Sequence, residues 1–399
     1  MRRWTTSAPD MRAADRAVDV LMVGGGVASA RCARTLRRNG FDGSLLVVGA
    51  EARAPYNRPP LSKELLRLDL SDELLAAEPQ SWYERRSVEL LIGATIERID
   101  PDDRLASLAG GGTIRFERAL IATGAEVRLL AIPGADGSIT LRTADDAARL
   151  RRTAVTAGPD APVVVVGGGF IGLEVASSLA WLGLRPTVVE LAPTLWGGTL
   201  GIELAAWATA RLTDVGVGLR LGARTTRLAD GAAWIDDERL PAAFVVVGVG
   251  VRPRTELAEA AGIRTDDGVV VDAGQRTSHP AVWAAGDVAR MEGRPRIEHW
   301  HAAREAGERA ALSMLGQPLP PLPAPWVFSE IGGMTLDLIG ATEGWEEEVW
   351  LDGARSILAY LRGNQVVGLA GTEGAVAPDL GRRLVEAGAT REEAAAALL

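Results

Sequence analysis

The sequence predicts an α/β fold in which one strand–turn–helix unit occurs twice and a smaller α+β domain follows. A β-branched, apolar run leads into a glycine turn at residues 24–26, and a helix-compatible segment comes directly after it. The same order returns at 162–172. Beyond a proline-rich stretch at 318–325, short apolar runs alternate with glycine and aspartate turns, as in an antiparallel sheet. The repeat therefore indicates two Rossmann-like domains.

The first glycine turn suits a bound pyrophosphate. Gly24 and Gly26 allow a tight turn and a close approach of a ligand to the backbone, and the start of the following helix offers free N–H groups. The third position of the Gly-x-Gly-x-x-Gly fingerprint is Ser29, which is small but not glycine. A sharp turn that binds nothing is the alternative interpretation of this stretch.

The second glycine turn carries the complete fingerprint, in Gly167, Gly169 and Gly172. A buried strand precedes it and a helical pattern follows, which is the context that a nucleotide site requires. The repeat extends further, because the apolar run 245–250 echoes 121–124. Two such units in one chain indicate two dinucleotides that face each other, and a flavin is the natural acceptor of hydride from NADH.

An acidic residue follows the second strand of each unit. Glu51 and Glu190 lie roughly 25 residues beyond Gly24 and Gly167, near the interval at which an acid accepts hydrogen bonds from a ribose. For Glu51, a solvated loop carboxylate is the alternative. The loop 191–194 contains no arginine that could hold a 2′-phosphate, so the second unit favours NADH over NADPH.

The segment 55–63 contains three prolines, which give it an extended, rigid course. Arg58 suits a pyrophosphate because its planar guanidinium can donate hydrogen bonds to two oxygens at once. Ser62 is expected to cap a helix that begins at Glu64. Among 43 basic residues, Lys63 is the only lysine. Lineage bias explains most of that skew, but a site too narrow for a guanidinium would retain a lysine. We therefore expect a functional role for Lys63.

Composition and charge exclude several classes of protein. The chain has 399 residues and a net charge of −9, which argues against a general nucleic-acid binder. Cys32 is the single cysteine and excludes an internal disulfide or a Cys-x-x-Cys pair; we expect it to be buried. No apolar run reaches the ~20 residues of a membrane span. Residues 1–17 lack the apolar core of a signal peptide and are expected to be a disordered tail, with translation starting at Met1 or Met11. A cytoplasmic location follows.

A third glycine-ended strand precedes Asp287, which could bind the ribityl or pyrophosphate part of a flavin. A helix N-cap is the alternative role for this aspartate. The next helix is expected from Glu298 to about Leu315. His299 and His301 are one residue apart and would not share a helix face, so no metal site is expected.

The order of the motifs resembles a known family. They are Gly24-x-Gly26-x-x-Ser29, 55–63, Ala122-Thr123-Gly124, 167–174, 248–253, Ala285-Gly286-Asp287 and Glu298-His299-Trp300. Together they resemble the FAD-dependent NADH:ferredoxin reductases, a group that contains putidaredoxin, rubredoxin and dioxygenase-system ferredoxin reductases and apoptosis-inducing factor. The resemblance extends from about residue 18 to 370 and implies a glutathione-reductase-like pair of Rossmann-like domains.

The resemblance also implies cofactor contacts. FAD would be held by Gly24, Gly26, Ser29, Glu51 and Arg58, and lined by Thr123, Gly124, Arg142 and Asp287. NADH would be bound by Gly167, Gly169, Gly172, Glu190 and Gly250. The expected cofactor-binding set is completed by Val27, Ile96, Ala122, Phe170, Ile171, Gly286 and Trp300. Lys63 would lie near flavin N5 and pair with Glu174 where the nicotinamide arrives.

The chain departs from the family in its C-terminal part. The family has an aromatic-Trp-Ser-Asp-Gln segment, and here the segment at 327–331 is Val-Phe-Ser-Glu-Ile. Phe328 would take the aromatic role beside the flavin ring without an indole donor. Arg254 replaces an asparagine of the family. These differences affect the prediction of the electron acceptor more than the prediction that NADH reduces FAD.

The resemblance implies an oxidoreductase with two half-reactions. Hydride would pass from NADH to FAD, and single electrons would pass to a [2Fe-2S] ferredoxin or similar small carrier that serves a P450 monooxygenase or a dioxygenase. The partner would dock on arginines of the first helix, unless these form a solvated face: Arg31, Arg34, Arg37 and Arg38. The alternatives are a quinone, oxygen or small-molecule acceptor, or an NADH-sensing interaction flavoprotein. We expect a monomer or homodimer.

Four domain segments follow from these motifs. The FAD-binding domain is expected at 18–132 and 254–317, with the NAD-binding domain inserted at 133–253. The C-terminal α+β domain is expected at 318–399, with four or five antiparallel strands and helices near 379–387 and 390–398.

Overall fold

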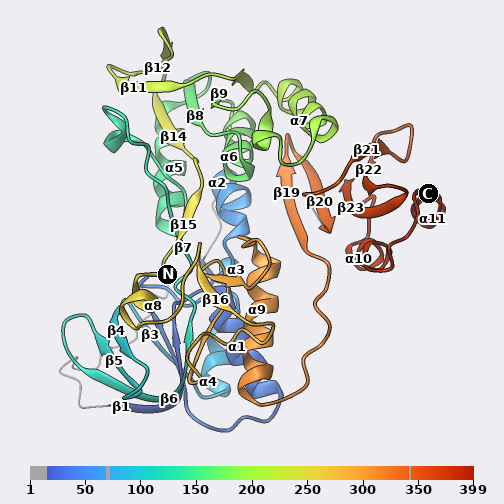
Figure 1. Cartoon of the computed structure of the whole chain (residues 1–399). Coiled ribbons are helices and arrows are strands. Elements are labelled where there is room, and N and C mark those ends of the chain that lie inside the picture. The colour runs from blue at the N-terminus through green and yellow to red at the C-terminus, as the bar shows by residue number, and fades with distance from the viewer. Residues whose placement is uncertain (1–15, 69–71, 341–342) are drawn as a thin grey trace. The chain divides into compact units, whose positions relative to one another are not determined.

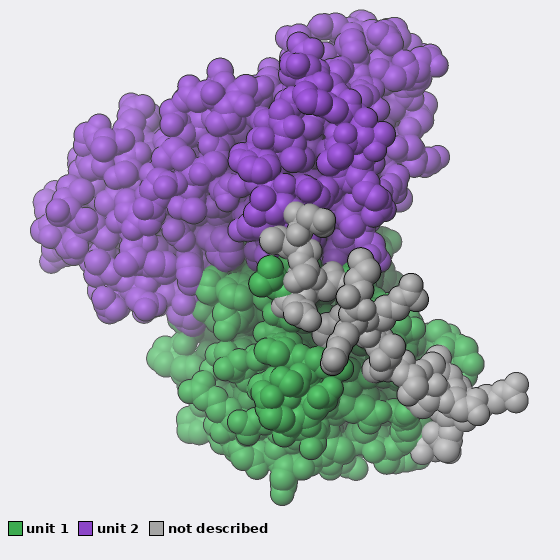
Figure 2. Space-filling model, turned by 180° about the vertical axis from the view of Figure 1, so that it is seen from behind, with its two compact units in different colours: residues 1–57, 71–126, 252–322 green, residues 58–70, 127–251, 323–399 purple. Residues whose placement is uncertain are grey.

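The computed structural model describes residues 16–68, 72–340 and 343–399; most of the expected N-terminal tail lies outside them. The chain divides into two compact units, which Figure 2 colours separately. Unit 1 comprises residues 1–57, 71–126 and 252–322, and unit 2 comprises residues 58–70, 127–251 and 323–399. Two of the points where the chain passes from one unit to the other lie in short strands, β7 (Ala125–Val127) and β15 (Val251–Pro253).

Unit 1 is built on one large sheet, whose strands follow the order β3-β2-β1-β6-β5-β4, with β17 also paired to β6. Strands β1, β2, β3, β6 and β17 run parallel, while β5 and β4 continue the sheet in antiparallel pairing. The bounds are β1 Arg16–Val23, β2 Leu45–Gly49, β3 Val88–Ile92, β4 Ile96–Asp100, β5 Leu105–Leu108, β6 Thr113–Ile121 and β17 Val282–Ala284. A smaller parallel pair joins β16 (Val269–Val271) to β18 (Ala289–Met291).

Two helices of unit 1 pack side by side against one face of this sheet, α1 (Val27–Arg38) and α9 (Trp300–Met314) (Figure 1). The two helices can approach closely because Gly307 has no side chain. A Cβ at this position would lie 2.3 Å from the carbonyl oxygen of Ala28. The buried face of α1 contains Cys32, whose pKa burial raises to about 12. The thiol is therefore a packing group, as the sequence predicts. The shorter helices are α3 (Asp72–Leu75), α4 (Gln80–Arg85) and α8 (Glu256–Ala260).

Unit 2 contains the second glycine turn in a parallel sheet of order β10-β9-β8-β14. The strands are β8 Pro162–Val166, β9 Arg185–Glu190, β10 Gly218–Leu221 and β14 Phe244–Val247. An antiparallel meander follows β10, formed by β11 Thr225–Ala229, β12 Ala232–Ile235 and β13 Glu238–Pro241. The longer helices are α5 (Ala144–Ala157), α6 (Phe170–Trp181) and α7 (Ile202–Asp214). The short ones are η1 (Pro59–Ser62), α2 (Glu64–Arg67), η2 (Ala135–Gly137) and η3 (Leu195–Gly198).

The C-terminal part of unit 2 is an antiparallel sheet of five strands in the order β19-β20-β23-β22-β21. The strands are β19 Trp326–Ile331, β20 Met334–Gly340, β21 Glu347–Trp350, β22 Ile357–Arg362 and β23 Gln365–Thr372. Two helices end the chain, α10 (Pro378–Glu386) and α11 (Arg391–Leu398) (Figure 1). The predicted antiparallel sheet of four or five strands and the two helices are confirmed, because alternating apolar residues and glycine turns mark strands clearly.

Polar contacts fasten this sheet to the start of α7. The Glu348 carboxylate accepts hydrogen bonds from the backbone nitrogens of Ile202 and Glu203, at 2.8 and 3.1 Å. An anionic group at these N–H groups also complements the helix dipole. The Trp350 indole donates to the carboxylate of Glu203 at 2.8 Å, and the Tyr360 hydroxyl donates to the carbonyl of Leu200 at 2.7 Å. Residues 323–399 thus belong to the same compact unit as 127–251, whereas the domain limits proposed from the sequence stay a prediction.

No helix within the described ranges combines the length and apolar character that a membrane span needs.

Candidate functional site

The first glycine turn has the geometry of a pyrophosphate site. Gly24 has a φ of +122°, and a Cβ there would lie 2.0 Å from the carbonyl oxygen of Ala122, which follows β6. Gly26 is the N-cap residue of α1, and no side chain of the described residues caps this end of the helix. A Cβ on Gly26 would meet nothing within 4 Å, so the space over the first N–H groups of α1 is open. The turn therefore fits the pyrophosphate of a dinucleotide.

The second glycine turn repeats this geometry in unit 2. Gly167 has a φ of +111°, and a Cβ there would lie 2.3 Å from the carbonyl oxygen of Gly248, which follows β14. Gly169 precedes α6, and a Cβ on it would again meet nothing within 4 Å. The two units therefore share the close strand contact and the open helix start, and both fit a dinucleotide.

The third fingerprint position differs between the turns for a steric reason. A Cβ at Gly172 would lie 2.1 Å from the carbonyl oxygen of Gly167, so α6 packs too closely for any side chain. At the corresponding place in unit 1, the hydroxyl of Ser29 donates a 2.6 Å hydrogen bond to the carbonyl of Gly24. A serine is accommodated there because its hydroxyl makes a hydrogen bond with the Gly24 carbonyl oxygen and does not clash with it.

Both predicted ribose acids have hydrogen-bond partners near their turns. The Glu190 carboxylate accepts from the backbone nitrogens of Gly168 and Ala192, at 2.6 and 2.8 Å. In unit 1, the hydroxyl of Tyr56 donates to the Glu51 carboxylate at 2.6 Å. These bonds hold the two carboxylates in defined positions, and their contacts with ribose stay predictions.

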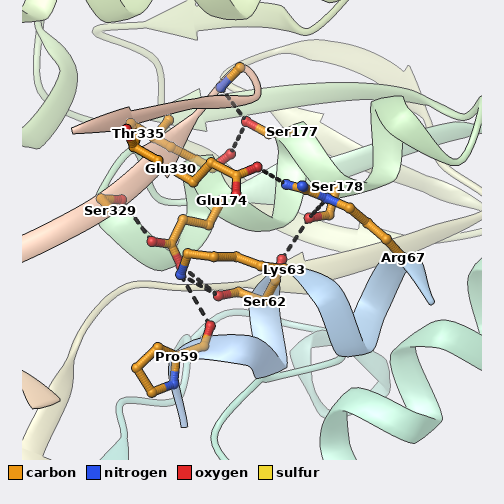
Figure 3. A network of polar contacts seen from close by, with 12 residues as sticks. Pro59, Ser62, Lys63, Arg67, Glu174, Ser177, Ser178, Ser329, Glu330 and Thr335 are labelled. Atoms are coloured by element: carbon orange, nitrogen blue, oxygen red, sulfur yellow. Dashed lines mark hydrogen bonds and ion pairs between the residues drawn. The ribbon is translucent and has the colours of Figure 1, made fainter. Parts of the chain in front are cut away.

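Lys63 and Glu174 form a buried ion pair, which the sequence resemblance predicts (Figure 3). Lys63 Nζ lies 2.6 Å from Glu174 Oε2, and the two side chains are 8% and 4% exposed. The ammonium also donates to the carbonyl of Pro59 at 3.1 Å. Removing one partner of such a pair would leave the other as an uncompensated buried charge.

Two serines complete the surroundings of this pair. The Ser62 hydroxyl donates to Glu174 Oε2 at 2.5 Å, and the Ser329 hydroxyl donates to Oε1 at 2.7 Å (Figure 3). The expected helix cap at Ser62 is therefore wrong: Lys63 occupies the N-cap position of α2, and the serine side chain turns to α6 instead. Ser329 was not singled out from the sequence, although it matches the serine of the family segment at 327–331; that match does not indicate its partner.

A second ion pair lies next to the first, between Arg67 of α2 and Glu330 of β19 (Figure 3). Arg67 Nε also donates to the hydroxyl of Ser178 at 3.0 Å, and that hydroxyl donates to the carbonyl of Ser62 at 2.7 Å. The backbone nitrogen of Gly332 donates to the Ser177 hydroxyl at 2.9 Å. These contacts fasten α2, α6 and β19 to one another.

Phe328 lies on β19 beside Trp326, with 6.3 Å between the ring centroids. Because successive strand residues face opposite sides, Phe328 faces away from the side on which Ser329 contacts Glu174. The predicted place of Phe328 beside a flavin ring stays a prediction.

The remaining predicted cofactor contacts occupy defined positions, and their roles are predictions. Arg58 donates to the carbonyl of Arg142. The Thr123 hydroxyl donates to the carbonyl of Arg254 at 2.8 Å, and the Trp300 indole donates to Asn57 at 2.7 Å. The other members are Val27 at the start of α1, Ile96 buried at the start of β4, the positive-φ glycines Gly124, Gly250 and Gly286, and Phe170 and Ile171 at the start of α6.

Asp287 does not cap the helix that follows it in the sequence. The N-cap of α9 is His299, whose ring accepts a hydrogen bond from the backbone nitrogen of His301. The capping alternative for Asp287 is therefore wrong, and the flavin alternative stays open. No cluster of three or more potential metal ligands occurs in the described part of the chain.

The arginines of α1 are mostly engaged within the chain. Arg31 pairs with Glu308, and Arg34 Nη1 lies 2.5 Å from Glu78 Oε1. Arg37 donates to the carbonyls of Phe41, Gly43, Arg86 and Ser87. The acidic partners were not predicted from the sequence, because Glu78 and Glu308 lie far from α1 along the chain. These contacts weaken the expectation that the four arginines form a free docking face.

Comparisons with known proteins agree with this geometry. The family model described as pyridine nucleotide-disulphide oxidoreductase matches residues 18–307. A rubredoxin-NAD(+) reductase of Pseudomonas putida is 33% identical over 343 residues, which cover 83% of this chain and 88% of that protein. The biphenyl dioxygenase system ferredoxin–NAD(+) reductase component of Paraburkholderia xenovorans (strain LB400) is 35% identical over 349 residues, covering 84% of each.

Solved structures are similar over nearly the whole chain. The reductase in a covalent putidaredoxin reductase–putidaredoxin complex has a TM-score of 0.88 and 28% identity, with 93% of each chain covered. The ferredoxin reductase for the CYP199A2 system from Rhodopseudomonas palustris has a TM-score of 0.89 and 31% identity, covering 94% of this chain and 97% of that one.

Proposed function

Because the chain belongs to the pyridine nucleotide-disulphide oxidoreductase family, we propose that it is a reductase that passes electrons from NADH through FAD to a ferredoxin-type protein. The family and the NAD(+) reductases among the relatives imply FAD and NADH as its cofactors. When bound, FAD would supply the chemistry that links two-electron transfer from NADH to one-electron transfer to the partner protein. The observation that carries the proposal is the buried ion pair between Lys63 and Glu174, whose glutamate lies on the helix that follows a complete dinucleotide fingerprint.

The Lys63–Glu174 pair would orient the nicotinamide. A carboxamide has an acceptor oxygen and a donor NH₂ group, and an ammonium beside a carboxylate matches both. Because both side chains are buried and each has further partners, they would hold the ring in one orientation. Such positioning accelerates a transfer that needs no general base.

Glu190 supports NADH over NADPH as the donor. Its carboxylate is fixed by two backbone N–H groups, and it would accept hydrogen bonds from the adenosine ribose while repelling a 2′-phosphate. The loop 191–194 adds no arginine to offset that repulsion.

We propose a [2Fe-2S] ferredoxin or similar small carrier as the partner, which in turn serves a P450 monooxygenase or a dioxygenase. The support comes from relatives whose names include rubredoxin, ferredoxin and biphenyl dioxygenase. We further propose that the chain acts in the cytoplasm as a monomer or homodimer, which sedimentation analysis of the purified protein tests.

Rapid-mixing spectroscopy tests the proposal. The FAD-loaded protein should be bleached by NADH much faster than by NADPH, and it should then reduce a [2Fe-2S] ferredoxin over many turnovers. Rapid bleaching with turnover only on a quinone, on oxygen or on a small organic acceptor would reassign the acceptor. Slow bleaching by both nucleotides would contradict the reductase function and favour an NADH-sensing protein.

A further inference from the structure

We propose that Ser329, on the first strand of the C-terminal sheet, is a positioning residue that fixes the Glu174 carboxylate against Lys63 (Figure 3). The inference rests on the proposed function, because it concerns the pair expected to orient the nicotinamide. It assigns the C-terminal sheet a part in the NADH half of the reaction.

The two carboxylate oxygens of Glu174 have different partners. Oε2 lies 2.6 Å from Lys63 Nζ and accepts a 2.5 Å hydrogen bond from Ser62. Oε1 accepts a 2.7 Å hydrogen bond from Ser329. The terminal torsion of a glutamate is broad, so contacts at one oxygen alone would leave the carboxylate free to rotate. Ser329 removes that freedom by holding the second oxygen.

Burial makes this hydrogen bond consequential. Ser329 is 2% exposed and the Glu174 side chain is 4% exposed, so water cannot readily replace a lost donor. A buried carboxylate oxygen without a donor is costly, and the side chain would move to recover one. Any such movement would also change the position of Lys63, whose ammonium is paired to the same carboxylate.

The position of Ser329 does not depend on Glu174. The residue pairs with Leu336 in the β19–β20 ladder, and the next side chain, Glu330, is paired with Arg67. Just beyond the strand, the backbone nitrogen of Gly332 donates to the Ser177 hydroxyl. The hydroxyl is therefore presented to Glu174 by a strand that is fastened on both sides.

Ser177 provides a matched control for loss of packing. Its hydroxyl also joins α6 to the β19 region and is buried, but it contacts Gly332 and Leu173, not Glu174. Ser177→Ala should therefore loosen the packing between α6 and β19 without freeing the carboxylate, because the ladder with β20 and the Arg67–Glu330 pair still hold Ser329 in place. Ser329→Thr retains the hydroxyl and suits a strand, so it serves as the conservative rescue.

The first measurement is flavin reduction by NADH in the FAD-loaded protein. Ser329→Ala should lower the limiting rate about tenfold, the scale of one hydrogen bond to a charged group, and change the apparent NADH affinity less than about twofold. Ser329→Thr should recover most of the rate, and Ser177→Ala should retain it. Equal rates in wild type and Ser329→Ala, or equal losses in Ser329→Ala and Ser177→Ala, would overturn the inference.

The second measurement needs neither cofactor nor turnover. Lys63 is the only lysine, so an amine-specific acylating reagent reports on this side chain, with the N-terminal amine as the internal reference. Peptide mass spectrometry should show acylation of Lys63 about fivefold or more faster in Ser329→Ala than in wild type or Ser177→Ala, because a freed carboxylate no longer holds the ammonium in place. If Ser329→Ala does not fold, Ser329→Cys, with its weaker donor, should show the same direction.

The two measurements separate the possible failures. A wild-type protein that NADH does not reduce, but whose Lys63 is unmasked by Ser329→Ala, contradicts the proposed function and retains the positioning role. Rapid reduction of the wild type, with Lys63 equally protected in all variants, contradicts the positioning role alone.

Discussion

The carboxylate of Glu190 accepts a 2.6 Å hydrogen bond from the backbone N–H of Gly168. This bond ties the end of β9 to the glycine turn before α6. On the other side, the backbone nitrogen of Trp196 donates to the Gly168 carbonyl at 3.0 Å. Gly168, between the first two glycines of the fingerprint, is thereby held through both its backbone N–H group and its carbonyl group. The Glu190 carboxylate is held in one position relative to the glycine turn.

Glu190→Ala should lower kcat/KM for NADH by about tenfold, or about 1.4 kcal/mol, because a ribose hydroxyl loses its acceptor. The value for NADPH should fall less, since repulsion of a 2′-phosphate is removed. Glu190→Gln is the comparison of similar shape: it loses the charge and retains an acceptor for only one of the two backbone N–H groups, those of Gly168 and Ala192. Steady-state kinetics with both nucleotides measure the effect, and an unchanged NADH-to-NADPH preference in both variants would contradict the assignment.

Gly26→Ala and Gly24→Ala should fail in different ways. A Cβ at Gly26 meets no protein atom within 4 Å, so the variant should fold normally and lose bound FAD, because the methyl group occupies the pyrophosphate space. A Cβ at Gly24 would lie 2.0 Å from the Ala122 carbonyl at a φ of +122°, so that variant should be unstable. Thermal unfolding and the ratio of flavin to protein absorbance distinguish the two. Full FAD content in Gly26→Ala would argue against this turn as the flavin site.

Lys63→Arg should not preserve activity, although it preserves charge. The Lys63 side chain is 8% exposed, and its ammonium fits between Glu174 and the Pro59 carbonyl, where a planar guanidinium is too broad. We expect the limiting rate of flavin reduction to fall about tenfold or more in both Lys63→Arg and Lys63→Met, with FAD content unchanged. A Lys63→Arg protein with wild-type reduction kinetics would show that charge alone suffices.

Asp337→Asn should stabilise the protein at neutral pH. Burial raises the pKa of Asp337 above its ordinary value of 3.8, and the Trp326 indole, which donates to it at 2.8 Å, opposes that shift only in part. A carboxyl with a raised folded-state pKa binds its proton more tightly in the folded protein, so stability declines as the pH rises from the ordinary value through the folded one. Asparagine keeps the acceptor for Trp326 and has no charge to bury. Urea unfolding should show a larger gain at pH 7.5 than at pH 4.5, and the reverse order would refute this account.

Local patterns in the sequence were sufficient for most of the fold. The glycine turns expected at Gly24 and Gly167 are present, and the structure adds that both glycines have positive φ and lie close to the backbone that follows a neighbouring strand. The strands of the C-terminal sheet follow from alternation between glycine turns. The pairing of Lys63 with Glu174 came from a family resemblance, and spacing alone would not reveal it.

Partners that are distant in sequence were beyond local reasoning. Ser62 has the composition of a helix cap, but its hydroxyl donates to Glu174 on another helix. Arg34 has the pattern of a solvated charge, but Glu78 lies against it. Ser329 matches the serine of the family segment, but its role depends on what the folded chain brings near it, and that could not be predicted from the sequence.

The contacts of Glu348 with the start of α7 have a consequence for the ancestry of the chain. The C-terminal sheet supplies the cap of α7, while its first strand supplies a hydroxyl to Glu174 on α6. A recombination event at the proline-rich stretch 318–325 would separate donors from acceptors at both places. The segments 127–251 and 323–399 should therefore be inherited as one block, and chimaeras of related chains should tolerate exchange of both together better than exchange of either alone.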